Sequence, residues 1–109
     1  MAFRLRATSG DFTSGTWITA QGTTLPLRHG QLQLQPLNTH NVAGRTLPTQ
    51  WRLRLPAQQH EQVTTAQTDL TIQALNPNSW MDVSLPYWEG PVTVAGSHKG
   101  QGYLEMTGY

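Results

Sequence analysis

The residues best suited to acid–base chemistry in this sequence stand in its last quarter. Glu89 follows directly after Tyr87 and Trp88. Burial beside these two rings would favour the protonated form of the carboxylate, which is the form that a general acid needs. Asp82 and Glu105 are weaker candidates, because both fall at outward positions of strands or turns. We therefore take Glu89, followed by Asp82, as candidate catalytic acids.

A structural role for Glu89 is the alternative to a catalytic one. Two arginines, Arg52 and Arg54, alternate with leucines in "QWRLRLP". We expect that segment to form a strand whose arginines could reach Glu89 from a neighbouring position. Ion pairs of this kind perturb carboxylates without any catalytic purpose. The ion pair is therefore the favoured explanation of Glu89.

The remaining motifs of known chemistry fail on their spacing. "HEQVT" begins like a zinc-protease helix, but Thr64 stands where the second histidine is required. The four histidines are scattered along the chain, so we expect no metal site. "GSHKGQG" lacks the residue spacing of a phosphate-binding loop and is more typical of a hairpin. No serine stands in a nucleophile elbow. We expect no bound cofactor.

Aromatic side chains offer a second kind of site. Each ring supplies a large apolar area and, in Trp and Tyr, one polar group. Two interpretations remain open: these rings pack in the core, or they form the wall of a cavity for a hydrophobic small molecule. The candidate ligand-binding residues are Trp17, Trp51, Tyr87, Trp88 and Tyr103.

The elements that position these side chains are predicted to be strands. Apolar and polar residues alternate with period two between Gly, Pro, Asn and Asp, as in "HGQLQLQPL", and helical periodicity is missing. About eight short strands result, which predicts an all-β antiparallel barrel or sandwich. We expect Leu37–Thr49 to be a loop. Ala57–Gln67 is ambiguous, because Gln and Ala tolerate helix whereas "VTT" favours extended structure. Asn76–Asn78 predicts a turn.

Composition excludes several classes of function. The chain has 109 residues, enough for one domain, and no linker divides residues 1–109. Only 12% of residues are charged and the net charge is +1, which leaves no footprint for nucleic acid. There is no cysteine. The start "MAFRLRATSG" has no apolar core typical of a signal peptide, and no run of about 18 apolar residues predicts a membrane-spanning segment.

Three segments carry a resemblance to a known family. "LPTQWRLRLP", "YWEGPVTVAG" and the terminal "GQGYLEMTGY" resemble the C-terminal lipocalin-like domain of the AttH and carotenoid 1,2-hydratase (hydroxyneurosporene synthase) superfamily. The resemblance extends over most of the chain, including "SGTWI" and "LQLQPL". It implies a lipocalin-like, calycin-type antiparallel barrel, and it implies that residues 1–109 are the C-terminal part of a longer bacterial two-barrel protein, periplasmic or secreted.

The resemblance also implies a role for the segment. The parent family handles hydrophobic, isoprenoid or lipid-like molecules, and its hydratase chemistry is placed upstream of the equivalent of Phe3. We therefore expect a non-catalytic module that offers an apolar pocket or packing surface. A hydratase or hydrolase with an isoprenoid or lipid substrate is the alternative. The barrel is expected to be incomplete, so its partner is the upstream barrel or, through an open edge at the strand Phe3–Ala7 ("FRLRA"), a second copy.

Overall fold

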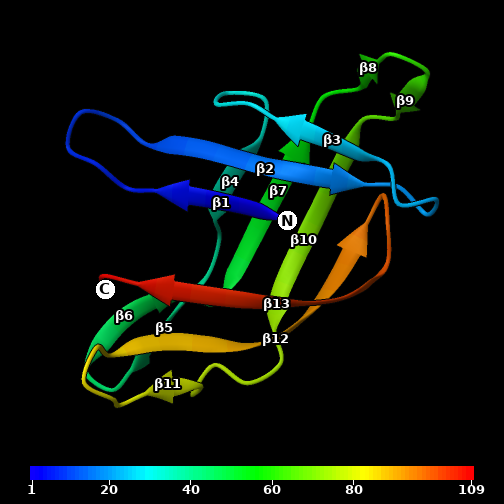
Figure 1. Cartoon of the computed structure of the whole chain (residues 1–109). Helices are drawn as coiled ribbons and strands as arrows, with labels where there is room; N and C mark the ends of the chain where they lie inside the picture. Colours follow the sequence, from blue (N-terminus) through cyan, green and yellow to red (C-terminus); the bar gives the residue numbers. More distant parts are fainter. The chain divides into compact units, whose positions relative to one another are not determined.

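The computed structural model describes all 109 residues, and every regular element in it is a β-strand (Figure 1). No helix is long and apolar enough to cross a membrane. The strands are β1 (Ala2–Leu5), β2 (Phe12–Ile18), β3 (Thr24–Leu27), β4 (Gln33–Pro36), β5 (Thr39–Val42), β6 (Arg45–Pro48), β7 (Gln50–Leu55), β8 (Gln58–His60), β9 (Val63–Thr65), β10 (Thr68–Ala74), β11 (Trp80–Met81), β12 (Tyr87–Gly96) and β13 (Gly100–Thr107).

Hydrogen bonding arranges these strands in four sheets. One has three strands in the order β1-β2-β3, and another follows β11-β12-β10-β7-β4 with β13 paired to β12. The β5–β6 and β8–β9 hairpins form two small sheets. Every registered pair is antiparallel. The all-β antiparallel class predicted from period-two alternation is confirmed.

The chain divides into two compact units. The first comprises Met1–Leu34 and Leu53–Asp69, and the second comprises Gln35–Arg52 and Leu70–Tyr109. In the first unit, apolar side chains of β3, β7 and the segment before β4 are buried, together with two threonines. These buried residues are Leu25, Leu27, Leu32, Leu53, Leu55, Thr13 and Thr68.

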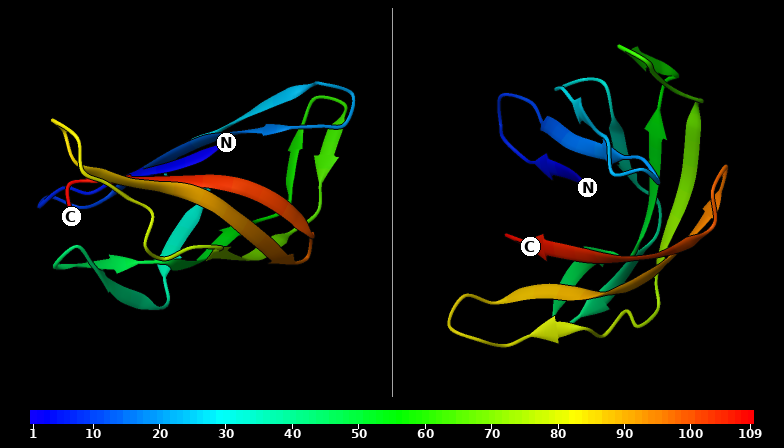
Figure 2. Two further views of the ribbon diagram at one scale, coloured as in Figure 1. Left: turned by 90° about the horizontal axis from the view of Figure 1, so that it is seen from below. Right: turned by 45° about the vertical axis from the view of Figure 1, so that its right-hand side comes forward.

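The second unit is organised around the long β12–β13 ribbon, whose strands run side by side over their whole length (Figure 2). Its buried side chains alternate along β12 with half-buried or exposed ones, as a strand with one covered face requires. Trp88 is fully buried at 0% exposure. The other buried side chains of this unit are Val42, Leu47, Thr49, Trp51, Ala74, Val92 and Met106.

The segment Leu37–Thr49, expected to be a loop, contains the β5–β6 hairpin instead. Its two-residue turn is Ala43–Gly44, with φ of 50° and 76°. Positive φ at both central positions defines the type I′ turn that suits a two-residue hairpin. Asn-Gly and Asp-Gly are the usual sequence signals for this turn, and alanine rarely adopts positive φ. The prediction of a loop was wrong because only Gly44 is typical of this turn, whereas Ala43 is not.

The ambiguous segment Ala57–Gln67 is also a hairpin, formed by β8 and β9. Its turn places Glu61 in the left-handed region at a φ of 53°. The extended preference of "VTT" therefore prevails over the helical tolerance of Gln and Ala. These two short hairpins, together with the two-residue β11, raise the number of strands above the eight expected.

Gly15 fixes the close approach of the first two strands. It lies in β2 opposite Ala2, and a Cβ at this position would stand 2.5 Å from the Met1 carbonyl oxygen. The same Met1 oxygen accepts a hydrogen bond from the Thr16 N–H at 2.8 Å. The glycine is therefore required by the space available to β1 and not by its own φ, which lies outside the positive range.

We predict that Gly15→Ala destabilises the protein. The methyl group meets backbone that cannot rotate away, so overpacking should cost about 1–3 kcal/mol of unfolding free energy. Gly100→Ala is the matched control, because a Cβ at Gly100 has no heavy atom within 4 Å. Urea unfolding should give a lower midpoint for Gly15→Ala alone. Equal midpoints for the two variants would show that β1 does not lie against Gly15.

Candidate functional site

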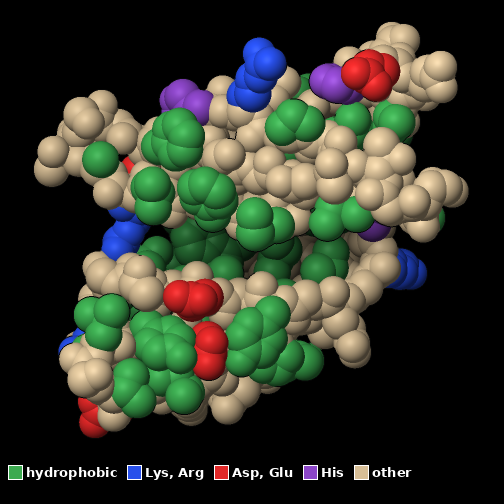
Figure 3. All heavy atoms as spheres, in the orientation of Figure 1, with side chains coloured by type: hydrophobic (Ala, Val, Ile, Leu, Met, Phe, Trp, Pro, Cys, Tyr) green, Lys and Arg blue, Asp and Glu red, His purple; other side chains and the backbone are tan.

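The candidate acid Glu89 lies on one face of the β12–β13 ribbon. The register places Glu89 directly opposite Glu105, and Pro91 opposite Tyr103. Tyr87 completes this face two residues before Glu89. Figure 3 shows acidic side chains flanked by hydrophobic ones over β12 and β13. We call these five residues the acidic–aromatic face.

The Tyr87 hydroxyl is coupled to the carboxylates of this face. Its hydrogen bond to Glu89 is the main cause that raises the pKa of Tyr87 above its usual value near 10. Partial burial and the negative charges of Glu89 and Glu105 act in the same direction. The hydrogen bond stabilises the neutral phenol, since an ionised Tyr87 could not donate a proton and would add a third negative charge.

The ion pair expected for Glu89 is not the contact that the structure shows. The side-chain partner of Glu89 is Tyr87, and Arg54 lies 3.5 Å from Asp69 instead. The Glu89 carboxylate also faces a like charge, because Glu105 is its direct cross-strand partner. Like charges in this position oppose pairing of the strands. The ribbon therefore forms in spite of this pair, held by its other face.

Asp82 and Glu105 are exposed, as their sequence positions predicted. Asp82 follows β11 in an irregular segment, whereas Glu105 lies in β13. Glu89 and Glu105 are thus brought together, and Asp82 is not part of their cross-strand pair. Within this pair, Glu105 is exposed and Glu89 is half-buried.

The five candidate aromatic residues occupy different environments. Trp88 is fully buried and donates its indole N–H to the Pro77 carbonyl at 2.7 Å. Trp51 is 7% exposed and donates to the Pro48 carbonyl at 3.0 Å. Both indoles therefore have a backbone acceptor, as buried tryptophans usually do. Tyr103, in contrast, is 66% exposed.

Trp17 is half-buried in β2, directly opposite Leu25 of β3. Cross-strand partners share one face of a sheet, with their Cβ atoms about 5 Å apart. Of the five aromatic residues, Trp17 is thus a direct neighbour of a residue that lines the hollow described below. Contact between any of these five rings and a ligand stays a prediction.

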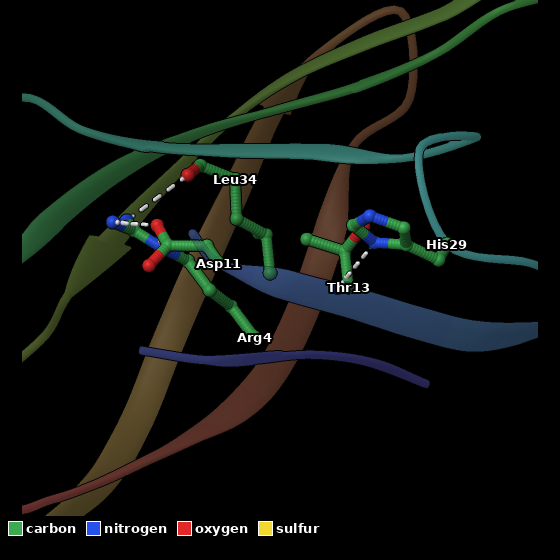
Figure 4. A network of polar contacts seen from close by, with 5 residues as sticks. All are labelled: Arg4, Asp11, Thr13, His29 and Leu34. Atoms are coloured by element: carbon green, nitrogen blue, oxygen red, sulfur yellow. Dashed lines mark hydrogen bonds and ion pairs between the residues drawn. The ribbon is translucent and has the colours of Figure 1, made fainter. Parts of the chain in front are cut away.

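Polar contacts in the first unit join its strands and loops to one another (Figure 4). Arg4 donates its Nε–H to Asp11 at 2.6 Å and an Nη1–H to the Leu34 carbonyl at 3.3 Å. His29 accepts the Thr13 N–H at Nδ1, 3.1 Å away. The His29 ring also stacks on Phe12, with ring centroids 5.1 Å apart. These contacts connect β1, β2 and the loop after β3, which is a structural role.

A hollow of about 370 Å³ lies in the first unit, between residues 25–31 and 56–60. Its volume is within the range of sites for small molecules, about 300–1,000 Å³. The apolar lining residues are Leu25, Pro26, Pro56 and Ala57. The polar lining residues are Arg28, Gln31, Gln58, Gln59 and His60.

None of the residues selected from the sequence lines this hollow. Its lining comes from β3, the loop after it and β8, so two chain segments about 30 residues apart must meet. Neither segment has a motif of known chemistry. No pattern in the sequence could have identified the site without the pairing of these strands.

The antiparallel all-β architecture belongs to the lipocalin-like class, and comparisons identify the family. The AttH-like family model matches residues 1–109, so the chain belongs to the AttH-like family. The crystal structure of a candidate AttH from Nitrosomonas europaea is similar, with a TM-score of 0.79 and 26% sequence identity. The match covers 99% of this chain and 34% of that one, so this chain spans about a third of its relative. No curated protein matches.

We predict that Glu89→Gln lowers the pKa of Tyr87 toward its usual value, because the strongest acceptor and one negative charge are lost together. Ultraviolet absorbance of the phenolate, followed during alkaline titration, measures the change. The absorbance change that is missing from the titration of Tyr87→Phe is the one that belongs to Tyr87.

The same shift makes stability depend on pH. Because the folded-state pKa of Tyr87 is raised, its contribution is complete below the unfolded-state pKa of about 10 and is lost as pH rises through the folded-state pKa. Glu89→Gln should weaken this alkaline loss. An unchanged Tyr87 midpoint in Glu89→Gln would contradict the hydrogen bond.

Proposed function

We propose that this chain is a lipocalin-like binding module of an AttH-like protein, and that it holds a hydrophobic, isoprenoid or lipid-like small molecule. The observation that carries the proposal is the 370 Å³ hollow with its wall of Leu25, Pro26, Pro56 and Ala57. The four apolar residues lie beside five polar ones, and small-molecule sites combine apolar surface with polar groups that orient the ligand. The membership of the chain in the AttH-like family supports the same module.

The proposed ligand site differs in position from the one expected from the aromatic residues. Trp51 and Trp88 are buried and have satisfied their indole N–H groups, which favours a packing role. Trp17 lies opposite Leu25 of the hollow, so a ligand there would change its surroundings. The hollow is therefore the better supported site.

We predict that retinol, an uncharged isoprenoid, quenches tryptophan fluorescence saturably, with a dissociation constant in the micromolar range typical of a modest apolar site. Ala57→Phe should weaken binding, because the ring fills the hollow. Ala95→Phe is the matched control, since Ala95 is an exposed residue of β12 outside the lining. Linear quenching without saturation, or equal affinity in both variants, would overturn the site.

A hydratase or hydrolase with an isoprenoid or lipid substrate is the second candidate. The Tyr87–Glu89 hydrogen bond favours it, because a phenol and two carboxylates on one face could transfer a proton. Hydration of an acyclic carotenoid by the purified chain, abolished in Glu89→Gln, would establish this activity. Equal turnover in the two proteins would exclude Glu89 as the acid.

For partners, we propose that the β1 edge pairs with a strand of the upstream barrel in a longer periplasmic or secreted protein. β1 is the edge of its sheet, and it exposes Phe3 and Leu5 beside Phe12 of β2. Exposed apolar residues next to an open edge favour strand addition.

Without that partner, the same edge should pair with a second copy. Light scattering during gel filtration over a concentration series should then show dimers or larger species. A monomer of 12.1 kDa at every concentration would contradict the open edge. Replacing Phe3 by lysine should reduce association, because edge lysines disfavour pairing.

A further inference from the structure

The polar lining of the hollow presents hydrogen-bond donors. Arg28 contributes a guanidinium group, which has only donors. The Gln31 side-chain oxygen already accepts the Arg28 backbone N–H at 2.6 Å, so its NH2 group is what remains for a ligand. Neither an aspartate nor a glutamate is among the lining residues. Glu61, the nearest carboxylate in sequence, is exposed in the β8–β9 turn and does not line the hollow.

Gln58 adds an independent observation. Its Nε2 atom is buried and has no hydrogen-bond partner. Buried polar groups in folded proteins are nearly always paired, and one without a partner calls for an explanation such as an absent ligand. Gln58 is half-buried and lines the hollow, so a rotation of its side-chain amide would bring this N–H to a ligand acceptor.

We propose that the ligand of this hollow is an amphiphile with a carboxylate head and an apolar body. The carboxylate would accept hydrogen bonds from the Arg28 guanidinium and the Gln58 amide, and the apolar body would cover Leu25 and Pro56. Guanidinium and carboxylate match in geometry and charge, which makes this pair stronger than neutral hydrogen bonds. The proposal rests on the proposed function and adds the chemical class of its ligand.

The position of the charged groups supports an anion over a cation or a neutral molecule. Arg28 is the one formally charged residue in the lining, and its guanidinium is in no ion pair. A cationic head would therefore meet a like charge, whereas a carboxylate could pair with the exposed Arg28 guanidinium. Figure 3 shows basic, histidine and hydrophobic side chains over β3 and β8, with an acidic side chain next to the histidine of the β8–β9 hairpin.

Three probes with the same alkyl chain test the head group: octanoate, 1-octanol and octylamine, each titrated into the whole chain by calorimetry. Octanoate should bind at least about tenfold more tightly than octanol, as hydrogen bonds to a charged group imply. Octylamine should show no saturable binding.

Substitutions then assign the contacts. Arg28→Gln should weaken octanoate binding about tenfold or more and leave octanol binding unchanged. Arg54→Gln is the matched control, because it removes the same charge from a residue that pairs with Asp69 outside the lining. Gln58→Met should also weaken octanoate binding, without lowering the urea midpoint, since it removes a buried N–H that has no partner in the free protein.

The outcomes separate this proposal from the proposed function. Equal affinity for octanoate and octanol, or octanoate binding that is insensitive to Arg28→Gln, overturns the carboxylate and leaves an apolar site intact. Retinol binding with no octanoate binding would also overturn the carboxylate head group and leave the apolar site of the proposed function intact. If neither retinol nor octanoate binds, the hollow is no ligand site and both proposals fall. If Gln58→Met lowers stability and keeps full octanoate affinity, the Gln58 contact is wrong.

Discussion

The complete burial of Trp88 is the constraint on which the second unit depends. Burying an indole of about 200 Å² stabilises the fold by roughly 5 kcal/mol, provided that its N–H finds an acceptor. The Pro77 carbonyl supplies it, held in place by the turn in which the Asn78 N–H and the Ser79 hydroxyl both bond to Asn76. Gly90 follows from the same packing, because a Cβ there would stand 3.0 Å from the Ser79 hydroxyl.

The face opposite Trp88 is a consequence of this arrangement. Side chains alternate along a strand, so burying Trp88 and Val92 on one side directs Tyr87, Glu89 and Pro91 to the other. Strand β13 then brings Glu105 opposite Glu89. The hydrogen bond to Glu89 is the main cause that raises the pKa of Tyr87, and the charge of Glu105 adds a smaller contribution. A group of residues that suggests an active site in the sequence is thus explained by strand geometry around one buried ring.

The first unit depends on a different contact, in which β3 and the loop after it meet the segment that leads into the β8–β9 hairpin. Leu25 is 3% exposed and joins the core, and it also lines the hollow between residues 25–31 and 56–60. The left-handed turn at Glu61 reverses the chain directly after His60, which ends this part of the lining. Arg28 and Gln58 thereby come to one concave surface, where we propose that a ligand binds.

Local patterns in the sequence were sufficient for the fold class and insufficient for the site. Alternation in "PVTVAG" and "GYLEMTGY" predicts the strands of the β12–β13 ribbon, because period two is a property of each strand alone. The β5–β6 hairpin was missed because Ala43 takes a positive φ that its sequence does not signal. Tryptophan occurs both in cores and in cavity walls, so only tertiary contacts show which of these two roles Trp51 and Trp88 have. Arg28 and Gln58 belong to segments that meet only when the chain folds.

We infer that ligand binding belongs to the hollow and not to the acidic–aromatic face. Two-dimensional amide NMR of the isotopically labelled chain, recorded during an octanoate titration, tests it most directly. We expect saturable shifts concentrated at residues 25–31 and 57–60, including the Gln58 side-chain amide, with residues 87–91 and 103–105 unchanged. Shifts concentrated on those two β12–β13 segments, with the hollow unchanged, would contradict it.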